Sequence, residues 1–385
     1  MCKLLPLLIL TLCLITIPSL PALDFGLVWN QNLQYYETGS ETVLDYEGIV
    51  IPRLTGIWGS TGAFHVSLGL NYENDPWAFV PELLTADIYM RGSNLELRLG
   101  RMFYIDPLGF IAGGLFDGGR VSFDMQAGTF SAGAWYTGLV YKKRLNIEMT
   151  GEELEHNDAG LDYGDFRNTY FAPRRLLAAL DWEHHGLGSR NRVAARAAIF
   201  GQFDFSGAGL HTQYLSAKLT APITGLIFNL GACLELIQNA GGFNTGFAAE
   251  LSTAWQNPTH RLELLSRFST AEFLPISSIA QSNVLSPKLS GVSFISLDYT
   301  ARFHRVLSAS ISSFYFMRSN AESFPFYNPN GRFLGAEVYG GLYWSPLSDL
   351  SLNVAGGIFL PSLGDIAPDA RNLWRIDVNL ILSLY

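Results

Sequence analysis

Strict alternation between apolar and small or polar side chains recurs along this chain of 385 residues, in segments of about ten residues. It is seen in residues 62–72, 226–236, 243–255 and 334–344. Alternation with a period of two is the pattern of a β-strand. Ten residues are also the length that a tilted strand needs to cross the core of a bilayer. The pattern therefore predicts an all-β protein whose strands cross a membrane.

Composition separates this prediction from a soluble β-sandwich or β-solenoid. Charged residues make up 15% of the chain, against about 25% in an ordinary soluble domain. The second face of each segment is small or polar, as expected of a wet lumen. Aromatic residues such as Trp29, Trp58, Trp255 and Trp344 stand near segment ends, where membrane girdles form. These features favour lipid-facing strands over a soluble fold.

The connections between the expected strands alternate in length. Short ones fall at residues 60–61, 92–93, 127–128, 221–223, 257–259, 304–305 and 345–349. The connections between them are mostly long, at residues 37–43, 74–78, 106–117, 142–170, 272–290, 319–331 and 361–371. Short periplasmic turns that alternate with long outer loops are typical of an outer-membrane barrel. We expect a transmembrane antiparallel up-and-down β-barrel over residues 23–385, with about 18 strands, or 16 if one hairpin is misassigned.

Residues 1–22 are predicted to be a signal peptide. Lys3 precedes an apolar run over residues 4–17, and cleavage is expected after Ala22. A lipoprotein signal ending at Cys13 is the alternative that we weigh against it. Without this segment Cys233 is the single cysteine, so no disulfide framework is expected. The net charge of −9 argues against a nucleic-acid partner.

Two short stretches carry a family resemblance. A strand ends in Leu97-Arg98-Leu99-Gly100-Arg101-Met102, and the next opens with Phe116-Asp117-Gly118-Gly119-Arg120-Val121. This arrangement resembles outer-membrane porins, including substrate-selective and alginate-export-like barrels. The resemblance implies a cell outer-membrane location and passive or weakly selective diffusion of small solutes. It also implies that the third loop, residues 105–118, folds inward as a constriction.

The last strand, residues 374–385, is similar to the terminal strand by which outer-membrane barrels are recognised for assembly. The resemblance therefore implies outer-membrane lipid and the barrel assembly machinery as partners. The residues expected to line the pore or its constriction are mostly charged groups near the third loop or on lumenal faces. They are Arg98, Arg101, Asp106, Asp117, Arg120, Arg261, Glu263 and Arg302. Rings of such side chains set ion selectivity in pores.

Two features keep other functions open. Loop 105–118 is mostly apolar, which also fits a transporter of hydrophobic solutes or a closed barrel that acts as an adhesin or a structural surface protein. Loop 142–170 is strongly acidic and matches no calcium-binding pattern, so we expect a solvated outer loop. The chain shows no hydrolase, metalloprotease or nucleotide-binding motif, and its best catalytic pair, His65 and Ser67, is weak. We expect no enzyme activity, no cofactor and no metal.

Overall fold

The computed structural model describes residues 22–38, 41–74, 77–187, 193–205, 207, 209–239, 242–320 and 328–384. The predicted signal segment lies outside these residues, apart from Ala22, which begins the first strand. The strands are β1 (Ala22–Thr38), β2 (Glu41–Trp58), β3 (Gly62–Asn74), β4 (Trp77–Arg91), β5 (Leu95–Ile105), β6 (Gly113–Met125), β7 (Gly128–Tyr136), β8 (Arg175–Leu187), β9 (Val193–Asp204), β10 (His211–Ile223), β11 (Leu226–Asn239), β12 (Gly242–Gln256), β13 (His260–Ser269), β14 (Val292–His304), β15 (Leu307–Arg318), β16 (Phe333–Trp344), β17 (Leu350–Leu360) and β18 (Leu373–Leu384).

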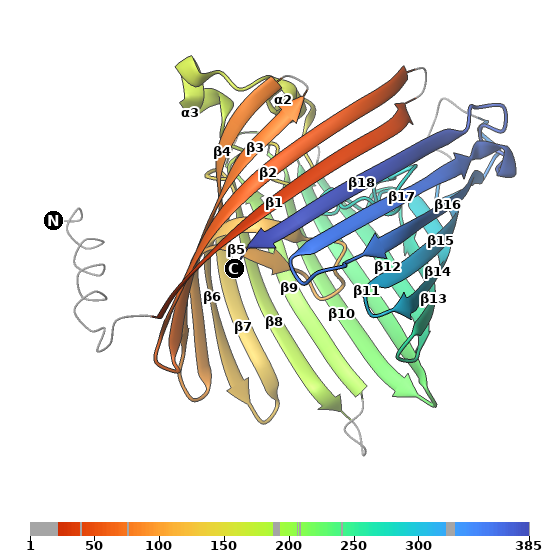
Figure 1. Cartoon of the computed structure of the whole chain (residues 1–385). Coiled ribbons are helices and arrows are strands. Elements are labelled where there is room, and N and C mark those ends of the chain that lie inside the picture. Colours follow the sequence, from red (N-terminus) through yellow and green to blue (C-terminus); the bar gives the residue numbers. More distant parts are fainter. Residues whose placement is uncertain are drawn as a thin grey trace.

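The 18 strands form one closed antiparallel barrel (Figure 1). Each strand pairs with its neighbours in the sequence, and β1 pairs with both β2 and β18. Closure leaves no sheet edge, which is the condition for a β-structure to stand in a membrane. The fold class and the expected number of strands are therefore confirmed.

The two ends of the barrel differ in the length of their connections. One end, called here the turn end, carries tight turns, and β1 begins and β18 ends there. Thr224 and Gly225 form one such turn, and both have positive φ angles of 48° and 85°. Two positive φ angles in a two-residue loop define a hairpin turn whose twist matches that of its strands. The other end, called the loop end, carries the longer connections, although only two residues separate β1 from β2, β3 from β4 and β11 from β12 there. The connections predicted at residues 37–43 and 74–78 are therefore shorter than expected, because the strands extend into them.

The alternation fixes which side chains face outward. On β11, Leu230 and Leu234 are 56% and 57% exposed on the outer surface, whereas Cys233 between them is 1% exposed. The outward face is apolar along most strands, and the lumenal face carries the polar and small residues. The lumen is thus defined by parity along each strand.

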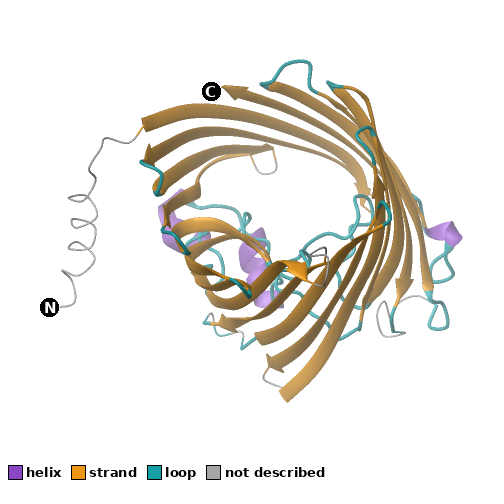
Figure 2. Cartoon of the chain, turned by 90° about the horizontal axis from the view of Figure 1, so that it is seen from below, coloured by secondary structure: helices purple, strands orange, loops and turns teal. Residues whose placement is uncertain are grey.

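Three loops from the loop end fold into the lumen (Figure 2). They are residues 106–112, 137–174 and 270–291, and their apolar side chains bury against the lumenal face of β5–β12. The loops also contact one another, since Ser277 N donates to Ile111 O at 2.9 Å and Glu148 N donates to Ile276 O at 2.8 Å. We call these three loops the plug.

The first loop is shorter than predicted. Strand β6 begins at Gly113 rather than near residue 118, because Gly113 and Gly114 pair with Ile105 and Tyr104. The remaining loop residues, Leu108, Phe110 and Ile111, are at most 3% exposed. Their apolar character is therefore explained by packing within the plug.

The long acidic loop also differs from the expected solvated loop. Its first part is buried, with Val140, Leu145 and Ile147 inside the plug. Only the helices α2 (Gly151–Asp158) and α3 (Phe166–Thr169), with the 3-10 turn η1 (Tyr163–Asp165), lie at the rim (Figure 1). A second 3-10 turn, η2 (Pro361–Leu363), follows β17. Within the described ranges, no helix is long and apolar enough to cross a bilayer.

Candidate functional site: the charged lumenal wall

A row of charged side chains crosses the lumenal face of β3–β9, on the turn-end side of the plug. Its members are His65, Asp87, Arg98, Arg120, Asp181, Glu183 and Arg196. Parity places them all in the lumen, because they alternate with outward residues such as Ile88, Leu99 and Leu180. We call this set the charge row.

The charge row is built from ion pairs between nearby strands. Arg98 donates to both oxygens of Asp87, at 2.8 and 3.2 Å. Asp87 also lies 3.6 Å from His65 Nδ1. Arg98 and Asp87 occupy diagonal positions in the register of β4 and β5, where long side chains meet.

Arg98 and Arg120 lie directly opposite each other on β5 and β6. Like charges in this position repel, and each guanidinium turns to a carboxylate on another strand. Arg120 Nη2 approaches Asp181 to only 3.6 Å, and its guanidinium makes no hydrogen bond with the described residues. Two adjacent arginines therefore keep unused N–H donors, and such donors suit carboxylate or phosphate oxygens.

Exposure within these pairs is unequal. Arg98 and Arg120 are each 40% exposed, whereas their partners Asp87 and Asp181 are 1% and 13% exposed. Arg196 is 49% exposed against 29% for Glu183. Water in the lumen therefore meets guanidinium groups first, although the chain as a whole is acidic.

The row continues toward the plug through a shared carboxylate. Glu250 on β12 accepts from Lys218 at 3.3 Å and from Arg267 at 2.5 Å. The Arg267 guanidinium also lies 4.1 Å from the ring centroid of Phe110 in the first plug loop. A cation over an aromatic face is attracted to it, so Arg267 ties the plug to the charged wall.

Three further predicted residues form a separate group on β13 and β14. Arg261 and Glu263 bind each other at 2.6 Å, with Arg261 the more exposed at 56%. Arg302 is exposed near the turn end of β14 and has no ion pair among the described residues. These strands are not neighbours of β5 and β6, and within the described residues no ion pair joins the two groups.

Arg101 and Asp117 do not line the lumen as predicted. They pair with each other on the outward face, where Leu99 and Phe103 are also exposed. Arg101 donates to Asp117 at 2.9 and 2.7 Å, and to the carbonyls of Leu83 at 2.5 Å and Leu139 at 2.8 Å. The physical reason is parity along the strand. Arg101 stands three residues from the lumenal Arg98, and Asp117 stands three residues from the lumenal Arg120, so both face the opposite side. The pair fastens the start of the long loop to the outside of β5.

Asp106 also differs from the predicted role. Its side chain is buried inside the first plug loop, where it accepts from the backbone N–H groups of residues 108, 109, 111 and 112. Burial raises the pKa of its carboxyl group above the ordinary value, and these four hydrogen bonds act in the opposite direction. Asp106 shapes the loop and does not face a passage.

Sequence reasoning missed the carboxylates of the charge row and the inward folding of the loop at residues 270–291. Parity on β4 and β8 would have placed Asp87 and Asp181 in the lumen, but their pairing depends on register. The role of Glu337 on β16 was not predicted from the sequence either. Glu337 accepts from the backbone of Asn283, Val284 and Leu285 and anchors the third plug loop to the wall opposite.

The weak catalytic pair is accounted for by other contacts. His65 faces Asp87, and Ser67 shares a hydrogen bond of 2.6 Å with Thr85. Among the residues that the structure describes, no group of three His, Cys, Asp or Glu side chains could hold a metal ion.

The barrel with inward loops and a charged wall has the architecture of an outer-membrane porin. Solved structures from Pseudomonas aeruginosa share this fold. OccK2 (OpdF), in complex with glucuronate, is 13% identical with a TM-score of 0.66, covering 94% of this chain and 98% of that one. OccK9 (OpdG) is 13% identical with a TM-score of 0.64, covering 94% and 98%. OccD3 (OpdP) is 12% identical with a TM-score of 0.61, covering 95% and 92%.

No protein-family model matches the sequence, and a search of curated proteins finds no match. At these identities the likeness is one of fold. The likeness therefore assigns no role to the residues of the wall.

Proposed function

We propose that this protein is an outer-membrane channel for passive diffusion of small solutes, with a preference for anionic ones. The observation that carries the proposal is the unequal exposure within the charge row. Each arginine of the row is more exposed than the carboxylate that it pairs with. A passing solute would meet a positive surface, and such surfaces raise the local concentration of anions.

Arg98 and Arg120 are the residues that we place at the constriction. They lie side by side below the plug, and their unused donors can bind a carboxylate in passing. The half-exposed state of both side chains supports a water-filled passage along this part of the wall. The glucuronate bound by OccK2 is itself an anionic sugar, which agrees with this choice of solute class.

The same proposal covers export and insertion. We infer that residues 1–22 direct the chain through the inner membrane and that the barrel assembly machinery inserts it among outer-membrane lipids. The apolar outward face and the closed strand order support this location. We assign the protein no enzymatic step.

The plug is relevant to the two alternative functions, a transporter of hydrophobic solutes and a closed barrel that acts as an adhesin or a structural surface protein. Its apolar side chains pack against β5–β12, so they supply a core rather than a lining for hydrophobic solutes. The closed-barrel adhesin is the alternative that conductance tests directly.

The experiment is single-channel recording of the refolded barrel in a planar bilayer under a salt gradient. We expect stable conductance steps and a reversal potential on the anion-selective side. Replacing both arginines, Arg98→Ala with Arg120→Ala, should move the reversal potential toward cations, because Asp87 and Asp181 are then left unpaired. The matched control is Arg305→Ala, in a turn at the far side of the barrel. A folded barrel without steps would overturn the channel, and an unchanged reversal potential would exclude these arginines.

A further inference from the structure

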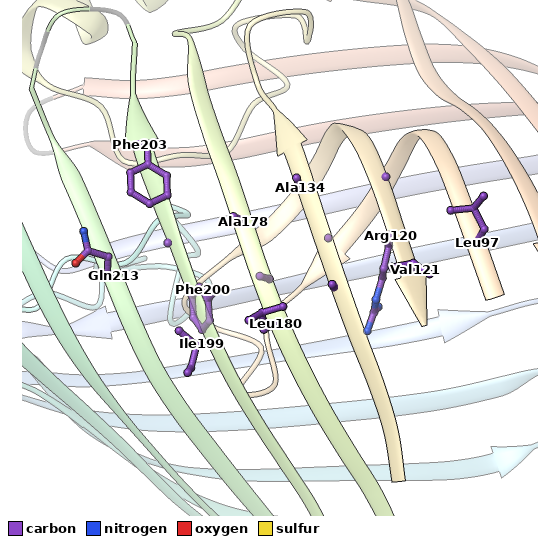
Figure 3. Close-up of a pocket in the computed structure, with 15 residues that line it drawn as sticks. Leu97, Arg120, Val121, Ala134, Ala178, Leu180, Ile199, Phe200, Phe203 and Gln213 are labelled. Atoms are coloured by element: carbon purple, nitrogen blue, oxygen red, sulfur yellow. The ribbon is translucent and has the colours of Figure 1, made fainter. Parts of the chain in front are cut away.

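An apolar groove runs across the outer surface of the barrel on β6–β9 (Figure 3). Its floor is a row of four small residues that are neighbours in the strand register, Gly119, Ala134, Ala178 and Gly201. The groove has a volume of about 560 Å³. This lies within the range of about 300–1,000 Å³ that is usual for sites that hold small molecules.

Large apolar side chains form the two banks of the groove. Figure 3 shows Phe203 in the upper part of the view beside Ala178 and Ala134, with Leu180 and Ile199 below them. Leu180 and Ile199 are each 60% exposed, so they project from the outer surface. In a bilayer this groove faces the acyl chains of the lipids.

The loop-end side of the groove leads directly to a polar recess. The recess is lined by Tyr136, Arg167, Arg174 and Phe205, among other residues. Tyr136 stands two residues beyond Ala134 on the same face, and Phe205 two beyond Phe203. Two residues of strand span about 7 Å, so the groove and the recess are contiguous.

The recess offers positive charge. Arg167 and Arg174 are exposed, and neither has an ion pair within the part of the chain that the structure describes. Of the two glutamates there, Glu153 is bound to Arg175 at 2.5 Å and Glu152 is exposed. Two cations face one uncommitted carboxylate, so the recess complements an anionic group.

A polar side chain at the end of the groove also lacks a partner. Gln213 lies beside Gly201 on the outward face, and its amide makes no hydrogen bond with any described residue. An unpaired amide in hydrocarbon costs free energy. An ester or amide group of a bound molecule would satisfy it.

We propose that this groove and recess form a binding site for a phosphorylated lipid of the outer leaflet. One acyl chain would lie on the floor of small residues, and the phosphate would meet Arg174 and Arg167. The inference rests on the proposed outer-membrane location and adds a defined lipid site to it.

The test is native mass spectrometry of the refolded barrel incubated with bisphosphorylated lipid A or with its dephosphorylated form. We expect one bound lipid on the unaltered protein. Ala134→Leu with Ala178→Leu should fill the floor and weaken binding of both forms about tenfold, as the loss of two buried methylene groups would. Arg174→Gln should weaken only the phosphorylated form, about fivefold.

The matched control is Ala249→Leu, an outward substitution on β12 away from the groove. Equal binding by the filled variant and the unaltered protein would overturn the site. A dimer that is lost in the filled variant would also overturn it, by assigning the groove to a second copy of the chain. Channel recordings on the same samples keep the two proposals separate, because lipid binding without conductance contradicts only the channel.

Discussion

The strands β5–β9 carry two different lumenal surfaces along their length. Toward the loop end, Met102, Phe116 and Phe200 are at most 4% exposed and pack against the plug. Toward the turn end, Arg98 and Arg120 on the same strands are 40% exposed. Facing the lumen therefore does not mean lining a pore, because the loops decide which lumenal side chains meet water.

The largest effect on stability is expected at Asp106, which shapes the first plug loop. Asp106→Ala removes the acceptor of four backbone N–H groups, two of them at residues that are fully buried. Each buried unsatisfied group costs about 1–3 kcal/mol, so the barrel should lose about 3 kcal/mol or more of stability toward urea. Conductance should rise as the plug loosens. Asp124→Ala, an exposed carboxylate at the turn end, is the control, and equal losses in the two variants would refute this role.

A smaller effect is expected at the anchor of the third plug loop. Glu337→Ala removes the acceptor of three backbone N–H groups and of Ser282 Oγ. Asn283 is exposed, and Val284 and Leu285 are only partly buried, so water can replace part of the loss. We expect about 1–2 kcal/mol of destabilisation and noisier single-channel current. A quiet channel of unaltered stability would show that the loop does not depend on this anchor.

The role of the charge row can also be tested without replacing an arginine. Asp87→Asn leaves Arg98 without its counter-ion, and a pair of unit charges in water interacts by about 1 kcal/mol. The reversal potential should therefore move further toward anions, the opposite direction from the double arginine variant. High salt should reduce the shift. A shift of the reversal potential toward cations would contradict the proposal that the more exposed arginines set the anion preference.

The smallest effect is expected at the boundary between the two surfaces. Tyr104 belongs to the plug contacts and donates to Asp181 of the charge row at 3.4 Å. Tyr104→Phe keeps the ring against Trp135 and removes only this long hydrogen bond, for a loss of about 0.5 kcal/mol. Urea unfolding would measure it, with conductance unchanged. A large change in conductance would mean that the two surfaces are coupled through this bond.

Much of the barrel could be predicted from the chain alone, because alternation and connection length are local properties. The same alternation also separates Arg98 from Arg101, which stand three residues apart and so face opposite sides. The similarity of the Gly-Arg motif to porins suggested that Arg98 and Arg101 both line the pore. Parity along β5 would have predicted that only Arg98 faces the lumen. The paths of residues 137–174 and 270–291 could not be predicted, because their partners lie far away in the sequence.

The contact between Gly113 and Ser277 joins residues 164 positions apart. Contacts of such range carry a large loop-closure cost and form late. The hairpins of the wall need no such contact, but closure of the wall needs one of still longer range, because it pairs β1 with β18. The plug and the closed wall therefore both depend on contacts between distant parts of the chain, so loss of either distant contact would affect the lumen as a whole.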